Sequence, residues 1–543
     1  MRDSLFKLFW KQRRFAVVAF LLTLIGTAIG LAQPLLAGFL VDSISDSVIP
    51  WMLVAGLVFL ALIGSAVETS ANYFQELMGE QAARTLRERL SKTLFTGQYS
   101  SVERLDSGDL ISTFNADVEA IRDGVAKGYI KLIVAIISGL IAFIMLGIVD
   151  LILLVAVCIV LIVAAAVALI FSVRIGTTSG AKQDGFADLG SDLLRLTSAL
   201  GSIRLVPMPN KETERITAKI DKVFLYGRRY SRLSAGVSPT VELAATGSLL
   251  VLLLIGSVRV SSGDIELGTM VTALLYANYL LVPLGNIIEA GVSLSTAQGV
   301  LPRIERILNI PLEKPSPSTA LSQVEDRGLA IKASNVRLET VDGTPLLDKV
   351  DFEVPKGTSL VVTGRSGVGK TSLLRTLCKF QPYSGALKVF GHEVSRTDAN
   401  ALRNQIALVE QNAPLLSGSI REAFALYRGN IDDEEILEAL RAVDVLDRLG
   451  GPTEALERIS GQNGYGLSGG ERQRVAVAVA LLSKRPLILA DEPMSNLDEH
   501  SRQLIKKLFL NRTHDQTLVI VSHDPRDVKW ADQTLALEGK NGD

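Results

Sequence analysis

Cysteine and histidine are both scarce in this sequence. Only two cysteines and four histidines occur among its 543 residues. Cys158 and Cys378 stand far apart, one in an apolar run and the other in a stretch with a helical pattern. We therefore expect neither a disulfide framework nor a cysteine metal site, and we interpret both cysteines as small buried hydrophobic residues.

A surplus of charge is also absent. The 56 lysines and arginines nearly balance 57 aspartates and glutamates, for a formal net charge of −1. The chain thus lacks the overall basic field that favours nucleic-acid binding, and we expect no nucleic-acid partner. We also expect no cleavable signal peptide, because the first apolar run is too long for one and lacks a small-residue cleavage site.

Long apolar runs dominate the first half of the chain instead. The mean hydropathy of +0.32 is high for a soluble enzyme. Buried helices of a soluble protein are the alternative interpretation, but the number of runs argues against it. The sequence predicts six membrane spans from segments that lack any charged residue and are long enough, or nearly so, to cross a bilayer: Phe15–Val41, Trp51–Val67, Leu132–Val149, Leu151–Val173, Leu243–Val258 and Leu267–Ile288.

Basic residues are distributed unevenly around these spans. Lysine and arginine precede the first span and are frequent in Glu68–Lys131 and Arg174–Glu242, whereas the loop Asp42–Pro50 has none. By the positive-inside rule, we expect both termini and both long segments in the cytoplasm, and the protein in the cytoplasmic (inner) membrane with several passes through the bilayer. Both long segments are predicted to be helical extensions, with breaks at Ser100–Gly108 and Val206–Asn210.

The composition changes after a proline-rich stretch. Pro311, Pro315 and Pro317, with neighbouring serines, mark a linker over residues 311–328. We expect residues 1–310 to form the helical membrane domain and residues 329–543 to form an α/β domain. Its predicted strands are Leu329–Leu338, Val350–Val354, Ser359–Gly364, Ile406–Gln411, Leu487–Asp491 and Thr517–Ser522.

A glycine-rich loop follows the third of these strands. Residues 364–371 match the phosphate-binding pattern GxxxxGK[ST] between a buried strand and the start of a helix. Lys370 is expected to reach the β and γ oxygens of ATP, and the Thr371 hydroxyl to ligate Mg²⁺. The predicted nucleotide-binding residues here are Gly364, Arg365, Ser366, Gly367, Val368, Gly369, Lys370, Thr371 and Ser372.

Two carboxylates lie at the end of the predicted strand Leu487–Asp491. Asp491 and Glu492 end the run PLILADE at the strand's carboxyl end, where α/β sheets bind ligands. We expect Asp491 to hold Mg²⁺ through water and Glu492 to orient or deprotonate an attacking water. An ordinary acidic turn is the alternative.

The stretch LSGGERQR joins a loop to the first turn of a helix. Ser468 offers a hydroxyl, and Gly469 and Gly470 expose backbone N–H groups ahead of Glu471. Because the dipole of the following helix favours negative charge, these four residues are predicted to bind an anion.

In this order, the glycine-rich loop, this stretch and the acidic strand end resemble the nucleotide-binding domain of an ATP-binding cassette (ABC) protein. With one six-span domain ahead of it, nearly the whole chain resembles an exporter-type (type IV) ABC half-transporter, whose ATPase is a P-loop α/β domain with a helical subdomain. The resemblance implies that the protein binds ATP and Mg²⁺ as cofactors. It also implies that Gln411 is the Q-loop glutamine, which senses Mg²⁺, that Ser495–Asp498 is the D-loop, and that His523 is the switch histidine. Glu492, His523 and Gln411 are then the expected catalytic residues.

In this family, short coupling helices of the membrane domain dock on the ATPase. Residues 107–124 and 198–216 resemble the two coupling regions, although Pro207 and Pro209 would shorten or distort the second.

Two expected features of the ATPase are missing. No aromatic residue lies near Thr340, where the family stacks one on adenine. Ile459–Tyr465 also lacks the glutamate usual before the family's signature motif, which the stretch Leu467–Arg474 (LSGGERQR) resembles. Stacking of this kind is worth about 1–3 kcal/mol per base in nucleic-acid binders. We therefore expect weaker ATP binding or another cover for the base.

The resemblance implies ATP-driven transport of an amphipathic or hydrophobic peptide, drug or lipid, with export expected. One chain carries one P-loop and one signature, and in the family two chains share each ATP, so we expect a second half-transporter as partner. A homodimer is the simpler hypothesis. A heterodimeric exporter subunit, a siderophore-type importer and an ATP-gated channel or regulator are alternatives, while the spans argue against a soluble ABC ATPase. The few residues before the first span argue against a peptidase-containing exporter.

Three glutamates lie toward the ends of predicted spans, at Glu68, Glu242 and Glu289. A carboxylate in mid-bilayer costs roughly 2.5–3.5 kcal/mol on insertion scales, so we expect all three to contact water or protein. One hypothesis is an acidic cavity for cationic amphiphiles or peptides. The alternative is that these glutamates lie on the cytoplasmic extensions and pair with neighbouring chains.

Overall fold

A computed structural model describes most of the chain, in two compact units. One unit comprises Met1–Ser91 and Gly108–Leu308, and the other comprises Lys92–Ser107 and Asn309–Asp543. The described residues are 13–45, 50–198, 200–205, 209–313, 328–339, 345–412, 418–429, 431–460, 467–495 and 497–538.

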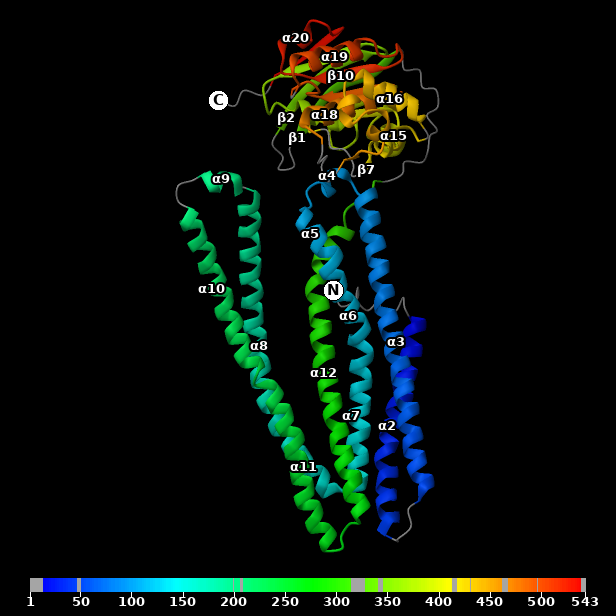
Figure 1. The fold of residues 1–543 in the computed structure, drawn as a ribbon, viewed down its shortest axis with the longest axis vertical. Coiled ribbons are helices and arrows are strands. Elements are labelled where there is room, and N and C mark those ends of the chain that lie inside the picture. The colour runs from blue at the N-terminus through cyan, green and yellow to red at the C-terminus, as the bar shows by residue number, and fades with distance from the viewer. Residues whose placement is uncertain are drawn as a thin grey trace. The chain divides into compact units, whose positions relative to one another are not determined.

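Long helices build the first unit (Figure 1). Five helices among the described residues are long and apolar enough to cross a membrane, whereas the apolar stretch Leu151–Ala164 is shorter. The predicted count of six spans therefore stays a prediction. Each predicted span lies in one of six long helices: α2 (Arg13–Ser45), α3 (Trp51–Thr96), α7 (Tyr129–Val149), α8 (Leu151–Ser198), α11 (Val237–Ser261) and α12 (Leu267–Leu308).

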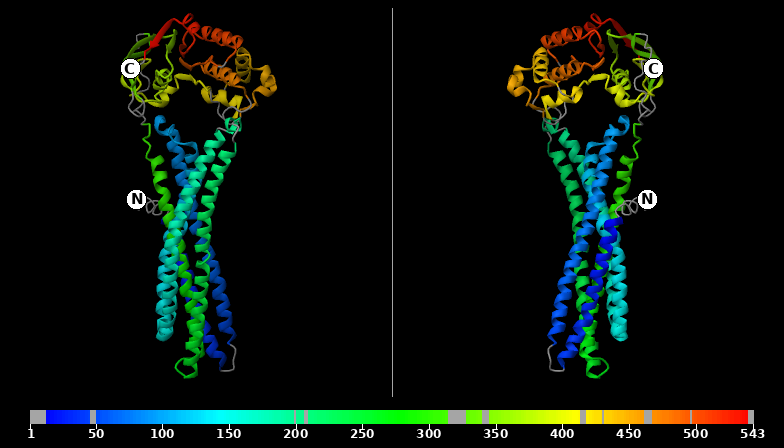
Figure 2. Two further views of the ribbon diagram at one scale, coloured as in Figure 1. Left: turned by 90° about the vertical axis from the view of Figure 1, so that its left-hand side faces the viewer. Right: turned by 90° about the vertical axis from the view of Figure 1, so that its right-hand side faces the viewer.

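Two groups of helices can be followed in Figures 1 and 2. The helix α12 packs along α7 and α2, while α8 packs along α11 and along α10 (Pro209–Ser234). The side chain of Asp192 on α8 joins α10 through Arg215 at 3.2 Å and Lys219 at 2.8 Å. Charged pairs therefore hold the long polar part of α8 to its neighbour.

Two helices approach each other closely where α12 begins beside α2. A Cβ added to Gly268 would lie 2.2 Å from the carbonyl oxygen of Gly38, and one added to Gly38 would lie 2.0 Å from the Thr272 hydroxyl. The Asp42 carboxylate accepts the backbone N–H of Gly268 at 2.6 Å. It therefore satisfies one of the donors that a helix start leaves unpaired.

The segments between the spans differ in part from the prediction. Residues 107–124 continue as α5 (Ser107–Ser112), a π-helical turn at Thr113–Asp117 and α6 (Val118–Asp123), followed by a second π-helical turn at Gly124–Gly128. The predicted break after residue 99 holds a short helix, α4 (Tyr99–Val102), which belongs to the second unit.

In the second coupling region, a short helix α9 (Leu200–Leu205) precedes α10. Pro207 lies outside the described residues. Pro209 is the first residue of α10, where the fixed φ of proline suits a helix start. Pro209 therefore begins a helix and does not distort one, whereas the predicted shortening of the second coupling helix stays a prediction.

The second unit is an α/β domain with all six predicted strands in place: β1 (Leu329–Glu339), β2 (Pro345–Pro355), β3 (Ser359–Gly364), β6 (Ile406–Val409), β9 (Leu487–Asp491) and β10 (Thr517–Val521). A five-stranded parallel sheet has the order β11-β3-β10-β9-β6, with β11 (Gln533–Leu537) at its edge. Every residue of β9 and β10 is buried.

Further elements surround this sheet. A four-stranded antiparallel sheet adds β4 (Ser384–Val389) and β5 (His392–Glu393) to β1 and β2, and β7 (Gly418–Ser419) pairs with β8 (Ile459–Ser460). The expected helical subdomain contains α15 (Ile420–Arg428), α16 (Asp433–Ala442) and α17 (Pro452–Ala455). Cys378 is buried as expected, whereas Cys158 is only half-buried. Of the predicted linker, residues 314–327 lie outside the described residues.

Replacing Gly268 with alanine is expected to destabilise the helical unit by about 1–3 kcal/mol, because the new methyl would overlap the Gly38 carbonyl and the Asp42 carboxylate. Thermal unfolding of the purified protein in detergent measures the change. Gly291→Ala on the same helix is the control, since a Cβ there meets no atom within 4 Å. An unfolding temperature that is equal in the two variants would contradict the close crossing.

Candidate nucleotide site

The parallel sheet brings the ends of its strands together at one edge. In the register, Val521 at the end of β10 pairs with Asp491 at the end of β9, and also with Val362 near the end of β3. Residues that follow these strands therefore meet at the carboxyl edge of the sheet. Gln411 follows the outer strand β6, and His523 follows β10.

The glycine-rich loop has the conformation that its glycines permit. Gly364, Gly367 and Gly369 have φ of +148°, +80° and +102°. A Cβ on Gly364 would lie 2.7 Å from the carbonyl oxygen of Leu537 on the neighbouring strand. The loop leads into the first turn of α13 (Lys370–Leu377), and free N–H groups at a helix start bind phosphate. Arg365, Ser366, Val368 and Ser372 lie in this loop and turn, as predicted.

Lys370 turns its amine back over the loop. The Nζ atom donates to the carbonyl oxygens of Gly364 and Arg365, each at 2.9 Å. Burial lowers the pKa of Lys370, while the nearby carboxylates Glu492 and Asp491 oppose that shift. An anionic phosphate is a stronger partner for an ammonium group than two neutral carbonyls. The side chain is therefore positioned to neutralise a phosphate held by the loop.

Asp491 and Thr371 form the part of the site that fits a divalent cation. Asp491 is 5% exposed, and burial raises the pKa of its carboxyl while a hydrogen bond from Thr371 lowers it. Hydroxyl and carboxylate oxygens are ligands that Mg²⁺ accepts together with phosphate oxygens. With one hydroxyl and one carboxylate, Thr371 and Asp491 fit a cation that is shared with a nucleotide.

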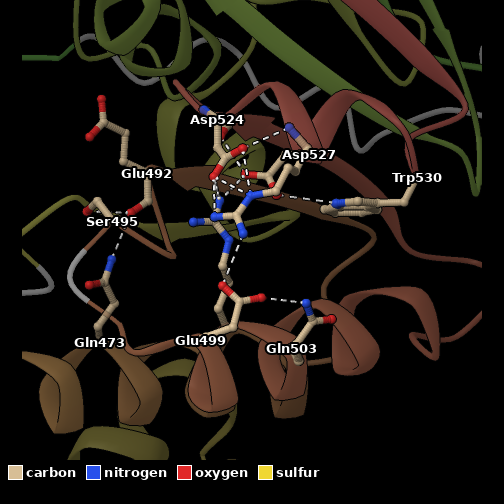
Figure 3. Close-up of polar contacts among 11 residues, drawn as sticks. Gln473, Glu492, Ser495, Glu499, Gln503, Asp524, Asp527 and Trp530 are labelled. Atoms are coloured by element: carbon tan, nitrogen blue, oxygen red, sulfur yellow. Dashed lines mark hydrogen bonds and ion pairs between the residues drawn. The ribbon is translucent and has the colours of Figure 1, made fainter.

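Glu492 is held on several sides. Its φ of +47° is unusual for a residue other than glycine. Its N–H donates to the Val521 carbonyl at 3.0 Å, and its own carbonyl accepts from the Gln473 amide at 2.9 Å (Figure 3). One carboxylate oxygen accepts from the Gln411 amide at 3.1 Å, and the other lies 2.8 Å from Nε2 of His523. The three predicted catalytic residues are thus brought together, but the role of Gln411 as a metal ligand stays a prediction.

The sequence pattern did not predict the ion-pair network behind His523. Arg502 lies 2.7 Å from Asp524 and 3.1 Å from Asp527, and the Ser522 hydroxyl donates to Asp527 at 2.5 Å. Arg526 binds Asp524 as well and lowers the pKa of that carboxyl to about 2. Figure 3 shows Asp524 and Asp527 beside each other in this network. This network fixes the loop that carries His523. In the sequence, the one feature that could have indicated it is the high density of charged residues after β10.

The predicted anion-binding stretch forms the start of α18 (Gly469–Leu482). Ser468 caps the helix: its hydroxyl accepts the Glu471 N–H at 3.2 Å, and the Glu471 carboxylate accepts the Ser468 N–H at 2.9 Å. Ser468 and Gly469 are exposed, and Gly470 is partly exposed. Within the described residues, the side-chain hydrogen bonds of Ser468 stay within its own cap.

Three features of the sequence analysis lie outside the described residues. They are Thr340 near the expected adenine position, residues 461–466 before the signature, and Asn496 of the D-loop.

The helix α4 contacts the end of the P-loop helix. The ring of Tyr99 stacks on Phe380, with centroids 4.2 Å apart and planes 26° from parallel. Glu103, one residue after α4, lies 2.9 Å from Arg375. These contacts come from residues of the second unit that precede the region 107–124. The assignment of that region as the first coupling region stays a prediction.

Sequence comparisons agree with this geometry in both halves of the chain. Residues 16–284 match the family model described as ABC transporter transmembrane region, and residues 347–495 match the model described as ABC transporter.

Individual relatives are 25–29% identical to this chain over the aligned residues. The leukotoxin translocation ATP-binding protein LktB of Pasteurella haemolytica-like sp. (strain 5943B) is 27% identical over 65% of this chain and 50% of its own. The beta-(1-->2)glucan export ATP-binding/permease protein NdvA of Agrobacterium vitis is 29% identical over 55% and 51%. The "Putative multidrug export ATP-binding/permease protein YgaD" of Bacillus subtilis (strain 168) is 25% identical over 97% and 93%. The chain spans about half the length of the first two.

A glycine-rich loop, an acidic strand end and a capped LSGG helix on one parallel sheet define an ATPase domain of the P-loop class. This one follows a multi-pass membrane domain on the same chain, and both parts match their family models. The chain belongs to the ABC transporter family.

Replacing Tyr99 with alanine is expected to loosen α4 from the second unit, because the stacked ring on Phe380 is lost. Aromatic pairs contribute about 0.5–1.5 kcal/mol, which corresponds to amide hydrogen exchange about 2- to 10-fold faster in α4. Tyr99→Phe keeps the ring and serves as the control. Unchanged exchange in the alanine variant would show that the stacking does not hold α4.

Proposed function

We propose that this chain is one half of an ATP-driven transporter that exports an amphipathic or hydrophobic peptide, drug or lipid across the cytoplasmic membrane. The observation that carries the proposal is the Glu492 carboxylate held between Gln411 and His523 beside the P-loop, in a chain with a multi-pass membrane domain. The names of the relatives describe translocation of a toxin and export of a glucan. They support export as the direction, and their different cargoes leave the substrate open.

The residues of the site divide the work of hydrolysis. Lys370 offsets charge on the phosphates, and the loop and the first turn of α13 orient them. Glu492 accepts a proton from the attacking water, and His523 holds that water and the γ-phosphate in position. Mg²⁺, held by Thr371 and Asp491, would supply further charge neutralisation at the phosphates.

Two chains are proposed to complete each ATP site. Ser468 and Gly469 are exposed at the start of a capped helix, where an anion is favoured. A γ-phosphate bound to one chain's Lys370 would then be covered by the cap of the other chain. One chain carries all the hydrolytic residues, so we propose a homodimer, with a heterodimeric exporter subunit as the alternative.

The distribution of basic residues supports an orientation with both termini in the cytoplasm. In that orientation the ATPase domain, the polar part of α8 and α10 and the helix α4 all lie on the cytoplasmic side. ATP-driven closure would reach the membrane domain through α4. The direct test is purified protein in proteoliposomes, in which ATP-dependent accumulation against a gradient supports a transporter and its absence alongside ATPase activity supports a channel or regulator.

Glu492→Gln is expected to bind ATP but to hydrolyse it at least about tenfold more slowly, because general-base catalysis contributes about 10²–10⁴-fold. ATP binding is measured with a fluorescent nucleotide, and hydrolysis by phosphate release. Glu438→Gln, at an exposed position on α16, is the control and should match the wild type. A near-wild-type rate in Glu492→Gln would remove Glu492 from this role.

Mixed dimers test the shared site. Lys370→Ala removes the phosphate contact, and Gly469→Asp places a negative charge at the cap, where the only atom that a Cβ would meet is Nη2 of Arg472 at 4.0 Å. Each variant alone is expected to be inactive. A tandem-purified mixed dimer should regain up to about half of the wild-type ATPase rate, because one of its two composite sites is intact.

Gly469→Ala is the control for that experiment and should stay active. A mixed dimer as inactive as its two parents would contradict a site completed between chains.

A further inference from the structure

A polar cavity of about 610 Å³ lies among α2, α3, α7 and α12 in the first unit. More than half of the residues that line it carry hydrogen-bonding side chains, including Gln33, Glu68, Asn72, Gln75 and Tyr279. Its volume is that of a site for a small organic molecule. Sites of this kind are usually lined by apolar and aromatic groups, so the polar wall requires an explanation.

Only some of these polar side chains form hydrogen bonds between helices. The Gln75 amide donates to the Thr23 hydroxyl at 3.1 Å, and the Tyr279 hydroxyl lies 3.4 Å from the Gln33 amide oxygen. These two contacts join α3 to α2 and α12 to α2. They fix the orientation of four wall side chains but do not involve Glu68.

The lining of the cavity holds two charged residues, Lys131 and Glu68, and in the described chain only Lys131 has an ion-pair partner. Lys131, which lines it, lies 3.3 Å from the Glu289 carboxylate, so that pair is neutral. Glu68 also lines the cavity, and within the described ranges no basic side chain forms an ion pair with it. Glu242, on α11, is exposed like Glu68 but is not among the lining residues. One negative charge therefore faces the cavity, in place of the three that the sequence suggested.

A lone carboxylate on an apolar helix is costly unless water or a cationic partner compensates it. The side chain of Glu68 lies on the same wall as the amides of Asn72 and Gln75, one and two helical turns further along α3. If a ligand bound Glu68 through a protonated amine, the rest of that ligand would lie beside the amides of Asn72 and Gln75. A neutral or anionic molecule of the same shape would lack that ion pair.

We propose that this cavity binds small organic ammonium ions, with Glu68 as the residue that selects for positive charge. The proposal rests on the transporter function and specifies the class of its substrate: a primary or secondary amine on a body that carries hydrogen-bonding groups. Binding occurs within the four helices of one chain. It therefore does not require ATP.

Dansylcadaverine and its N-acetyl derivative form a matched pair of probes. They share the same fluorophore and chain, but only the first carries an ammonium group. Full-length protein in lipid nanodiscs is titrated with each probe without nucleotide, and empty nanodiscs are subtracted. The wild type should bind dansylcadaverine at least tenfold more tightly than the acetylated probe, a difference of about 1.4 kcal/mol.

Glu68→Gln should remove that preference, with both probes binding as the acetylated probe binds the wild type. Glu68→Asp should retain a preference for the ammonium probe, and Glu242→Gln should leave it unchanged. Size-exclusion profiles and unfolding temperatures show that the variants are folded. An equal preference in Glu68→Gln and wild type, or the absence of saturable dansylcadaverine binding to the wild type, would overturn the proposal.

ATPase activity of the wild type in the same nanodiscs separates the two proposals. Hydrolysis without selective dansylcadaverine binding counts against the cavity assignment alone. Selective binding without hydrolysis counts against the ATPase role alone.

Discussion

The nucleotide site depends on one strained backbone position, Glu492. A residue other than glycine in the left-handed region costs of order 1–3 kcal/mol and persists only when its surroundings fix it. Here the parallel pairing of β9 with β10 places the Glu492 N–H against Val521, and Gln473 from α18 holds its carbonyl. This conformation turns the carboxylate toward Gln411 and His523. The sheet register and the signature helix are therefore both needed to position one catalytic group.

The same arrangement links the phosphate site to α4 by a short path. The helix α13 begins with Lys370 and Thr371 at the phosphate loop, and its eight residues span about 12 Å. Arg375 near its other end and Phe380 just beyond it contact Glu103 and Tyr99. Because α13 is a rigid helix between these two sets of contacts, a small displacement of the phosphate loop can move α4 without rearrangement of the core. This explains why a four-residue helix with no buried residue can serve as a contact for the ATPase.

Much of the fold was predictable, because buried strands and membrane helices leave strong apolar patterns. The strands that were missed have weaker patterns: β4 is mostly exposed, and β11 alternates at the edge of its sheet. Motif spacing identified the P-loop, Glu492 and His523 because each follows a buried strand. The network of Arg502 with Asp524 and Asp527 was not predictable, since it depends on how the loop after β10 folds against α19 (Glu499–Leu510). Four-residue helices such as α4 show no periodicity at all.

The pairing of charged residues in the membrane domain was likewise not predictable from the sequence. The sequence showed three glutamates toward the ends of spans and no reason to treat them differently. Pairing separates them: Glu289 meets Lys131 across 158 positions of sequence, whereas Glu68 has no such partner in the described chain. Neutralised carboxylates stabilise helix contacts, and an uncompensated one destabilises the domain until a cation or water reaches it. Because Glu68 is exposed and lines a polar cavity, its carboxylate is open to a cationic ligand.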